Sequence, residues 1–127
     1  MFSIEADKSR RLVVISFAGH VTAEDAKEAT QKVHETLVDI APNFRALTDL
    51  RWLESMQTEA SPYVAEIMDA LARKKVSSVV RVIPDPRKDI GFTILSQFHY
   101  GPEIRTVTFE TLADAVQSLA GEEAGDR

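Results

Sequence analysis

Residues Phe44 to Met56 read FRALTDLRWLESM, and this stretch decides the fold class. Its first half, Arg45 to Leu50, is a short apolar run that predicts a buried β-strand. The next helix-start signal is Ser61-Pro62, so a long connection follows the strand. Connections of this kind carry binding residues in many α/β proteins, and we therefore expect the functional surface here. Three side chains suited to binding come at or just past the end of the strand: Asp49, Arg51 and Trp52.

Length and composition are those of one ordinary folded domain. The chain has 127 residues, of which 44% are hydrophobic and 28% charged. A net charge of −5 argues against general nucleic-acid binding, which needs a basic stripe to neutralise phosphates. The absence of cysteine excludes disulfides and cysteine-type metal centres. With no signal-peptide pattern and no apolar run of about 20 residues, we expect a cytoplasmic protein without a membrane span.

Hydrophobic periodicity and turn residues give the order of the remaining elements. Gly19 closes the second strand, and Thr22 with Asp25 has the spacing of a capping box at the first helix. Ser61 is the expected N-cap of the second helix, with Pro62 in its first turn. The predicted strands span 2–6, 12–17, 45–50, 78–83 and 104–109, and the predicted helices span 22–41, 61–75, 89–100 and 111–119.

This alternation predicts an α/β domain in the order β-β-α-β-α-β-α-β-α. We expect a mixed, mostly parallel sheet of about five strands with four helices. Residues 1–120 form the single predicted domain, and 121–127 are expected to be a flexible tail. Parallel sheets bind ligands beyond the carboxyl ends of their strands, so the loops after the second, third and fourth strands should share one edge. Those loops carry His20 and Thr22; Asp49, Arg51 and Trp52; and Asp85, Arg87 and Lys88.

The element order and the segment Ala46 to Thr58 resemble the SpoIIAA-like group of the STAS superfamily. That superfamily includes anti-sigma factor antagonists and the cytoplasmic domains of sulfate transporters, and some small members are similar to lipid-binding Sec14-type domains. The resemblance covers residues 2–120 and rests on an apolar strand followed by Asp49-Leu50. The family's Asp-Ser-Ser-Gly stretch, in which a partner kinase phosphorylates a serine, falls on Gln57 to Ala60. Thr58 is then the candidate acceptor, without the flanking Asp and Gly.

The first functional hypothesis, implied by this resemblance, is a non-enzymatic regulatory or protein-interaction module. Its candidate partner-binding residues are Asp49, Arg51, Trp52, Thr58 and Tyr63. The alternative is a carrier or sensor of a small apolar or anionic, lipid-like ligand. Its pocket would lie between the sheet and the helix at 89–100, lined by Phe92, Leu95 and Phe98. A homodimer through an amphipathic helix is compatible with either hypothesis.

An enzyme ranks third, because it needs a cluster of titratable groups in a cleft. Asp49, His20 and Asp85 are the only candidate members, and no cofactor or metal is expected. The histidines, His20, His34 and His99, are not spaced as metal ligands, and His34 should be solvated on a helix. Two of the candidate residues also have simpler interpretations. Asp49 can cap the turn that follows it, and Trp52 can cover the core.

Overall fold

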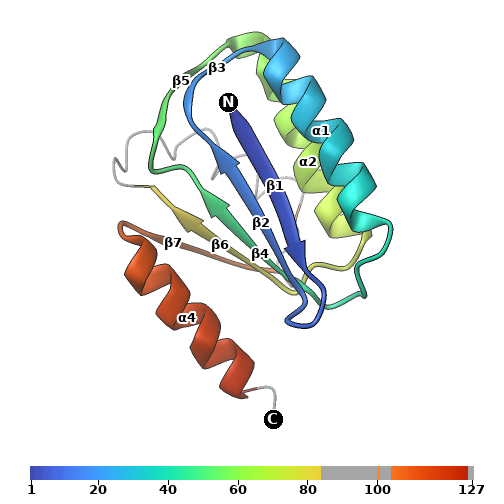
Figure 1. The fold of residues 1–127 in the computed structure, drawn as a ribbon, viewed down its shortest axis with the longest axis vertical. Helices are drawn as coiled ribbons and strands as arrows, with labels where there is room; N and C mark the ends of the chain where they lie inside the picture. Colours follow the sequence, from blue (N-terminus) through green and yellow to red (C-terminus); the bar gives the residue numbers. More distant parts are fainter. Residues whose placement is uncertain (84–99, 101–103, 126–127) are drawn as a thin grey trace.

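A five-stranded sheet forms the middle layer of the computed structural model, which describes residues 1–83, 100 and 104–125 (Figure 1). Its strands, in spatial order, are β1 (Phe2–Asp7), β2 (Leu12–Phe17), β4 (Arg45–Asp49), β6 (Ser78–Val82) and β7 (Arg105–Phe109). The β1–β2 hairpin is antiparallel, and every other neighbouring pair is parallel. The predicted mixed, mostly parallel sheet is confirmed.

Helices cover both faces of this sheet (Figure 1). On one face lie α1 (Ala23–Leu37) and α2 (Ser61–Arg73), and on the other lies α4 (Leu112–Gly125). The helix continues to Gly125, beyond its predicted end and into the segment expected to be a tail. The helix expected at 89–100 lies outside the described residues except for its last residue, Tyr100, which is in a bend. Also outside them lie Asp85, Arg87, Lys88, Phe92, Leu95, Phe98 and His99.

The first helix begins as the sequence predicts and ends earlier. The Thr22 hydroxyl accepts a hydrogen bond from the Asp25 amide at 3.1 Å, and the Asp25 carboxylate accepts one from the Thr22 amide at 3.0 Å. The helix stops at Leu37 because the chain turns there and buries Ile40, whose amide donates to the Leu37 carbonyl at 3.4 Å. The apolar side chain of Ile40 therefore belongs to the core but not to the helix.

The prediction that Ser61 caps α2 is wrong. A short 3-10 helix, η1 (Thr58–Ala60), runs directly into α2, and Ala60 occupies the N-cap position. The Ser61 amide donates to the Thr58 carbonyl, so the turn that precedes the helix already satisfies this donor. Pro62 lies in the first turn, where its missing N–H costs nothing.

A second, two-stranded sheet was not predicted. It pairs β3 (Gly19–Val21) in parallel with β5 (Leu53–Met56), within segments that the sequence pattern indicated to be loops. The Gly19 amide donates to the Trp52 carbonyl at 2.8 Å, and Gly19 has a φ of +69°, a conformation that favours glycine. Strands this short carry too few residues to show a period, and their partners are distant in sequence.

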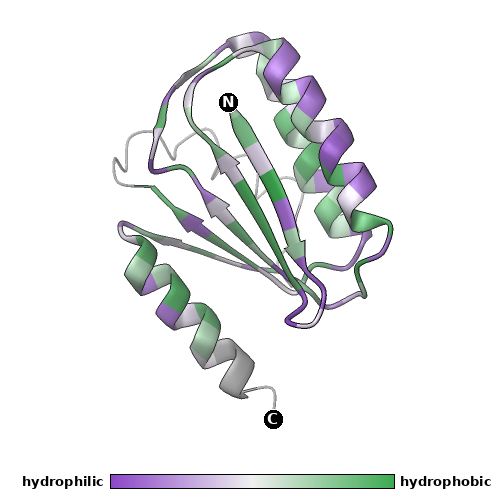
Figure 2. Ribbon diagram, in the orientation of Figure 1, coloured by the Kyte–Doolittle hydropathy of each residue, from purple (hydrophilic) through white to green (hydrophobic). Residues whose placement is uncertain are grey.

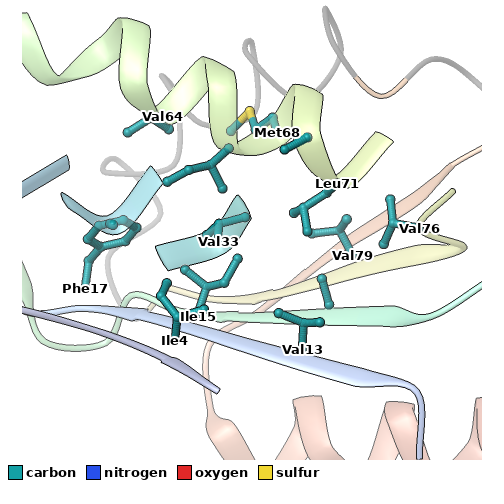
Figure 3. Packing of buried hydrophobic residues seen from close by; sticks show 14 of the residues in the cluster. Ile4, Val13, Ile15, Phe17, Val33, Val64, Met68, Leu71, Val76 and Val79 are labelled. Atoms are coloured by element: carbon teal, nitrogen blue, oxygen red, sulfur yellow. The ribbon is translucent and has the colours of Figure 1, made fainter. Parts of the chain in front are cut away.

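Hydrophobic residues line the strands and polar residues cover much of the outer surface of α1 (Figure 2). The larger core lies between the sheet and the α1–α2 layer. There Val33, Val64, Met68 and Leu71 face Ile4, Val13, Ile15, Phe17 and Val79 (Figure 3). A smaller core lies under α4 and consists of Leu47, Val80, Val82, Ala115 and Leu119. Burial on both faces explains why β6 is buried throughout.

Candidate functional site

Strands β2, β4 and β6 run parallel, so their carboxyl ends meet at one edge of the sheet. The loops that follow β2 and β4 lie side by side there, because each continues into one strand of the small β3–β5 sheet (Figure 1). The structure therefore brings the first two predicted loops together. The third loop, after β6, lies outside the described residues.

Asp49 is the last residue of β4 and holds Arg51 in place. The Asp49 carboxylate accepts three hydrogen bonds, all donated by Arg51: from its backbone amide at 3.1 Å, from Nε at 2.9 Å and from Nη2 at 2.8 Å. The two guanidinium bonds form the bidentate geometry that gives arginine–carboxylate pairs their directional strength. Asp49 thus caps the turn, as its simpler interpretation predicts, and also fixes the direction of the Arg51 side chain.

The same contact determines the charge of Asp49. The hydrogen bonds donated by the Arg51 guanidinium lower the pKa of the Asp49 carboxyl, and the cost of its partial burial only partly opposes them. A carboxylate with a lowered pKa holds protons weakly, so Asp49 is poorly suited to act as a general base near neutral pH. This places it among the structural groups of the edge.

Asp49→Asn is expected to lower the free energy of unfolding by about 1 kcal/mol at neutral pH, the upper end for a partly exposed ion pair. Because the folded-state pKa of Asp49 lies below its unfolded value, its contribution is complete above about pH 4 and is lost as the pH falls through the folded-state value. Urea unfolding of both proteins at pH 7 and pH 3 should therefore show a difference that shrinks in acid. An equal difference at both pH values would contradict this.

Trp52 projects from the same turn into solvent. Its relative exposure is 66%, and the Arg51 guanidinium carbon lies 5.6 Å from the centre of its ring. The interpretation of Trp52 as a cover over the core is therefore wrong. Its backbone carbonyl is held by the Gly19 amide, while its neighbour Arg51 is held by Asp49. The ring is thus exposed on a backbone that is bonded on both sides, next to a cation that favours its face.

Thr58 and Tyr63 contribute differently to this edge. Thr58 is exposed at the first position of η1, so its hydroxyl is accessible. Tyr63 is partly buried against the larger core, and its carbonyl accepts a hydrogen bond from the Thr30 hydroxyl at 3.1 Å. Thr58 is therefore more accessible to a partner than Tyr63 is.

His20 makes a contact that the sequence did not reveal. Its Nδ1 lies 2.5 Å from the Ser55 hydroxyl, across the β3–β5 pair. The Gln57 side chain makes a second such contact, accepting a bond from the Ala23 amide at 2.8 Å. Both follow from pairing between distant segments, so no local pattern could have indicated them.

Of the other two histidines, His34 is on α1 and His99 lies outside the described residues. The His34 Nε2 lies 3.3 Å from Oε1 of Glu66 on α2, and both side chains are partly exposed. In the described ranges no three histidines or acids are grouped to hold a metal ion. His20 and Asp49, two of the three candidates for an enzyme, bind different partners: Ser55 and Arg51.

A small cavity of about 20 Å³ lies between α2 and the sheet. Its walls are mainly apolar, with Thr48, Arg81 and Tyr100 as the polar lining, and burial raises the pKa of the Tyr100 hydroxyl. A cavity of this size holds about one water molecule. It is not by itself a preformed lipid pocket, and the ligand-carrier alternative rests on residues outside the described ranges.

No protein-family model and no curated protein matches the chain, whereas several solved structures do. One is an uncharacterized protein of the DUF3478 family from Shewanella loihica PV-4, described as having a SpoIIAA-like fold. It is 20% identical, with a TM-score of 0.70 over 94% of this chain and 92% of that one. The fold is SpoIIAA-like.

Two further structures with this fold are anti-sigma factor antagonists. SpoIIAA in its unphosphorylated form is 18% identical, with a TM-score of 0.63 over 95% of this chain and 99% of that one. An antagonist from Mycobacterium paratuberculosis is 20% identical, with a TM-score of 0.59 over 94% and 95%. At such identities the likeness establishes the fold, and function needs its own argument. Within the described residues, no helix is both long and apolar enough to cross a membrane.

Proposed function

We propose that this chain is a non-enzymatic regulatory module that binds a protein partner through the carboxyl edge of its sheet. We call this region the Trp52 surface, defined by Asp49, Arg51, Trp52, Thr58 and Tyr63. The observation that carries the proposal is the exposure of Trp52, at 66%, on a turn that hydrogen bonds hold in place. Asp49 accepts a bond from the Arg51 amide, and the Trp52 carbonyl accepts one from the Gly19 amide. Tryptophan is enriched among the few interface residues that dominate binding energy.

The local hydrogen bonds favour recognition because they reduce its entropic cost. An interface residue whose surroundings are already ordered loses less freedom on binding. Asp49 fixes Arg51, and the Gly19 amide fixes the Trp52 carbonyl, before any partner arrives. Two guanidinium nitrogens of Arg51 are already engaged, so its main part in this proposal is to support the ring.

The chemistry of the edge also favours binding over catalysis. Asp49 has a lowered pKa and binds Arg51, whereas His20 contacts Ser55, so Asp49 and His20 do not form an acid–base pair with each other. The fold shared with two anti-sigma factor antagonists supports a regulatory role of the same general kind. The ligand-carrier alternative remains a prediction from the sequence.

Trp52→Ala tests this function. Loss of an anchoring tryptophan typically costs about 2–4 kcal/mol of binding, so we expect partner affinity to fall at least ~30-fold. The free energy of unfolding should change by less than about 0.5 kcal/mol, because the side chain is exposed. The measurement is affinity capture from lysate of the source cells, followed by titration of each captured protein against wild type and variant.

Val38→Ala is the matched control. Val38 is 71% exposed at the C-cap of α1, away from the Trp52 surface. Like Trp52→Ala, the Val38→Ala variant removes an exposed apolar side chain. It should capture the same proteins as wild type. If Trp52→Ala also captures them with unchanged affinity, the Trp52 surface is not the binding site.

A further inference from the structure

The two described loops at the carboxyl edge form one continuous surface around Trp52. The Gly19 amide bonds to the Trp52 carbonyl at 2.8 Å, the Gln57 amide bonds to the Val21 carbonyl at 2.9 Å, and the Ala23 amide bonds to the Gln57 side chain at 2.8 Å. These bonds join β3 and the start of α1 to β5 and η1. Charged side chains on either segment therefore lie on the same continuous edge as Trp52.

This edge is acidic once internal pairs are removed. Arg51 is paired with Asp49, and Asp25 is engaged in the capping box of α1 and lies near the Met1 amino group. Three exposed carboxylates remain, and none forms an ion pair with another described residue: Glu24, Glu54 and Glu59. The edge that carries Trp52 therefore also carries negative charge that the described residues do not neutralise: Glu54 on β5, Glu59 on η1 and Glu24 at the start of α1.

We infer that the partner presents a basic protein surface, with lysine or arginine side chains around an apolar recess that receives Trp52. This inference rests on the proposed function and specifies its partner. A partner that covers the Trp52 surface from Trp52 to Thr58 must also remove water from carboxylates along it, and an unpaired carboxylate in an interface carries a large desolvation cost. Cationic side chains offset that cost and reject acidic competitors.

The test must distinguish the effect of where the charges lie from the effect of the net charge of the protein. The double variant Glu54→Lys with Glu59→Lys reverses two carboxylates on β5 and η1, within the segment that carries the Trp52 surface. The control, Glu5→Lys with Glu35→Lys, reverses two exposed carboxylates on β1 and near the end of α1 and gives the same net charge. Both proteins should remain folded because all four side chains are exposed.

The defined probe is a dye-labelled amphipathic peptide of lysine and leucine, about 18 residues or five helical turns long. A peptide with glutamate in place of lysine serves as its acidic counterpart. Anisotropy gives the affinity for every variant. Emission from Trp52, the only tryptophan in the chain, reports whether its ring is buried.

We expect the basic peptide to shift the Trp52 emission to the blue and to bind the control variant at least tenfold more tightly than the Glu54→Lys, Glu59→Lys variant. Affinity should also fall as NaCl rises from about 20 to 300 mM, because salt screens exposed charges. Equal weakening in both double variants, or equal binding of the acidic peptide, overturns the inference.

Capture from lysate separates this inference from the proposed function. If Trp52→Ala loses partners that the Glu54→Lys, Glu59→Lys variant retains, the basic partner is wrong and the Trp52 surface stands. If Trp52→Ala retains every partner, the proposed function itself fails.

Discussion

Phe44→Ala is expected to lower the free energy of unfolding by about 3–5 kcal/mol, the usual cost of truncating a buried aromatic side chain. Phe44 is 0% exposed, immediately before β4, and is the largest fully buried side chain of the described chain. Its backbone carbonyl accepts bonds from the Ser77 amide at 2.8 Å and the Ser77 hydroxyl at 3.0 Å. The cavity left by alanine would lie where β4 and β6 begin, so the sheet has little freedom to collapse around it.

Phe44→Leu is the graded control for this prediction, because it keeps most of the buried volume. It should cost less than about 2 kcal/mol. Urea unfolding followed by far-ultraviolet circular dichroism measures both variants without relying on Trp52, which is already exposed in the native protein. Since domains of this kind are stable by only about 5–15 kcal/mol, the alanine variant should show a clearly lower midpoint. Equal losses for alanine and leucine would show that the ring is not packed as described.

The sequence predicts the architecture well because its signals are local. These signals are the alternation in Phe2 to Ala6, the apolar runs of β2 and β6, and the Thr22–Asp25 capping box, and each spans only a few residues. The order of these elements then determines a mostly parallel sheet. A local signal gives a wrong prediction where a neighbouring element takes over its role. Ser61 has the sequence pattern of an N-cap, but its amide already donates to the Thr58 carbonyl of η1.

The candidate site was predicted in position but not in detail. Topology places Asp49, Arg51 and Trp52 at the carboxyl edge, and the structure agrees. The pairing of β3 with β5, and with it the His20–Ser55 contact, joins residues 35 positions apart and leaves no local trace. The exposure of Trp52 could not be predicted either, because an apolar residue at a strand end suits the core and the surface equally.

Arg45 is another residue whose role the sequence concealed, since the pattern indicates only the start of a strand. Its side chain lies under α4 and is 7% exposed. Nη1 donates to the Leu119 carbonyl at 2.8 Å, and Nη2 donates to the Arg10 carbonyl at 2.7 Å. One guanidinium thus joins α4 to the β1–β2 turn, using acceptors that only the folded chain brings together.

Arg45→Met is expected to lower the free energy of unfolding by about 2–3 kcal/mol. Hydrogen bonds that involve a charged group contribute about 1.5–3 kcal/mol each, but methionine also removes the cost of burying the charge. The loss should be local at first. Among the described side chains the core under α4 is small and takes Ala115 and Leu119 from the helix, whereas α1 and α2 each bury more apolar residues in the larger core.

Hydrogen exchange followed by mass spectrometry distinguishes this local effect from a general one. In Arg45→Met, exchange should accelerate most in α4 and the β1–β2 turn, with α1 and α2 protected nearly as in wild type. Arg45→Lys keeps the charge, but its side chain has one nitrogen and should bind one of the two carbonyls instead of both. We therefore expect the exchange rates of this variant to lie between those of wild type and Arg45→Met. Uniform acceleration across the chain would contradict this and mean that Arg45 supports the whole fold. A residue that specifically anchors α4 should, when replaced, release that helix while the core under α1 and α2 stays closed.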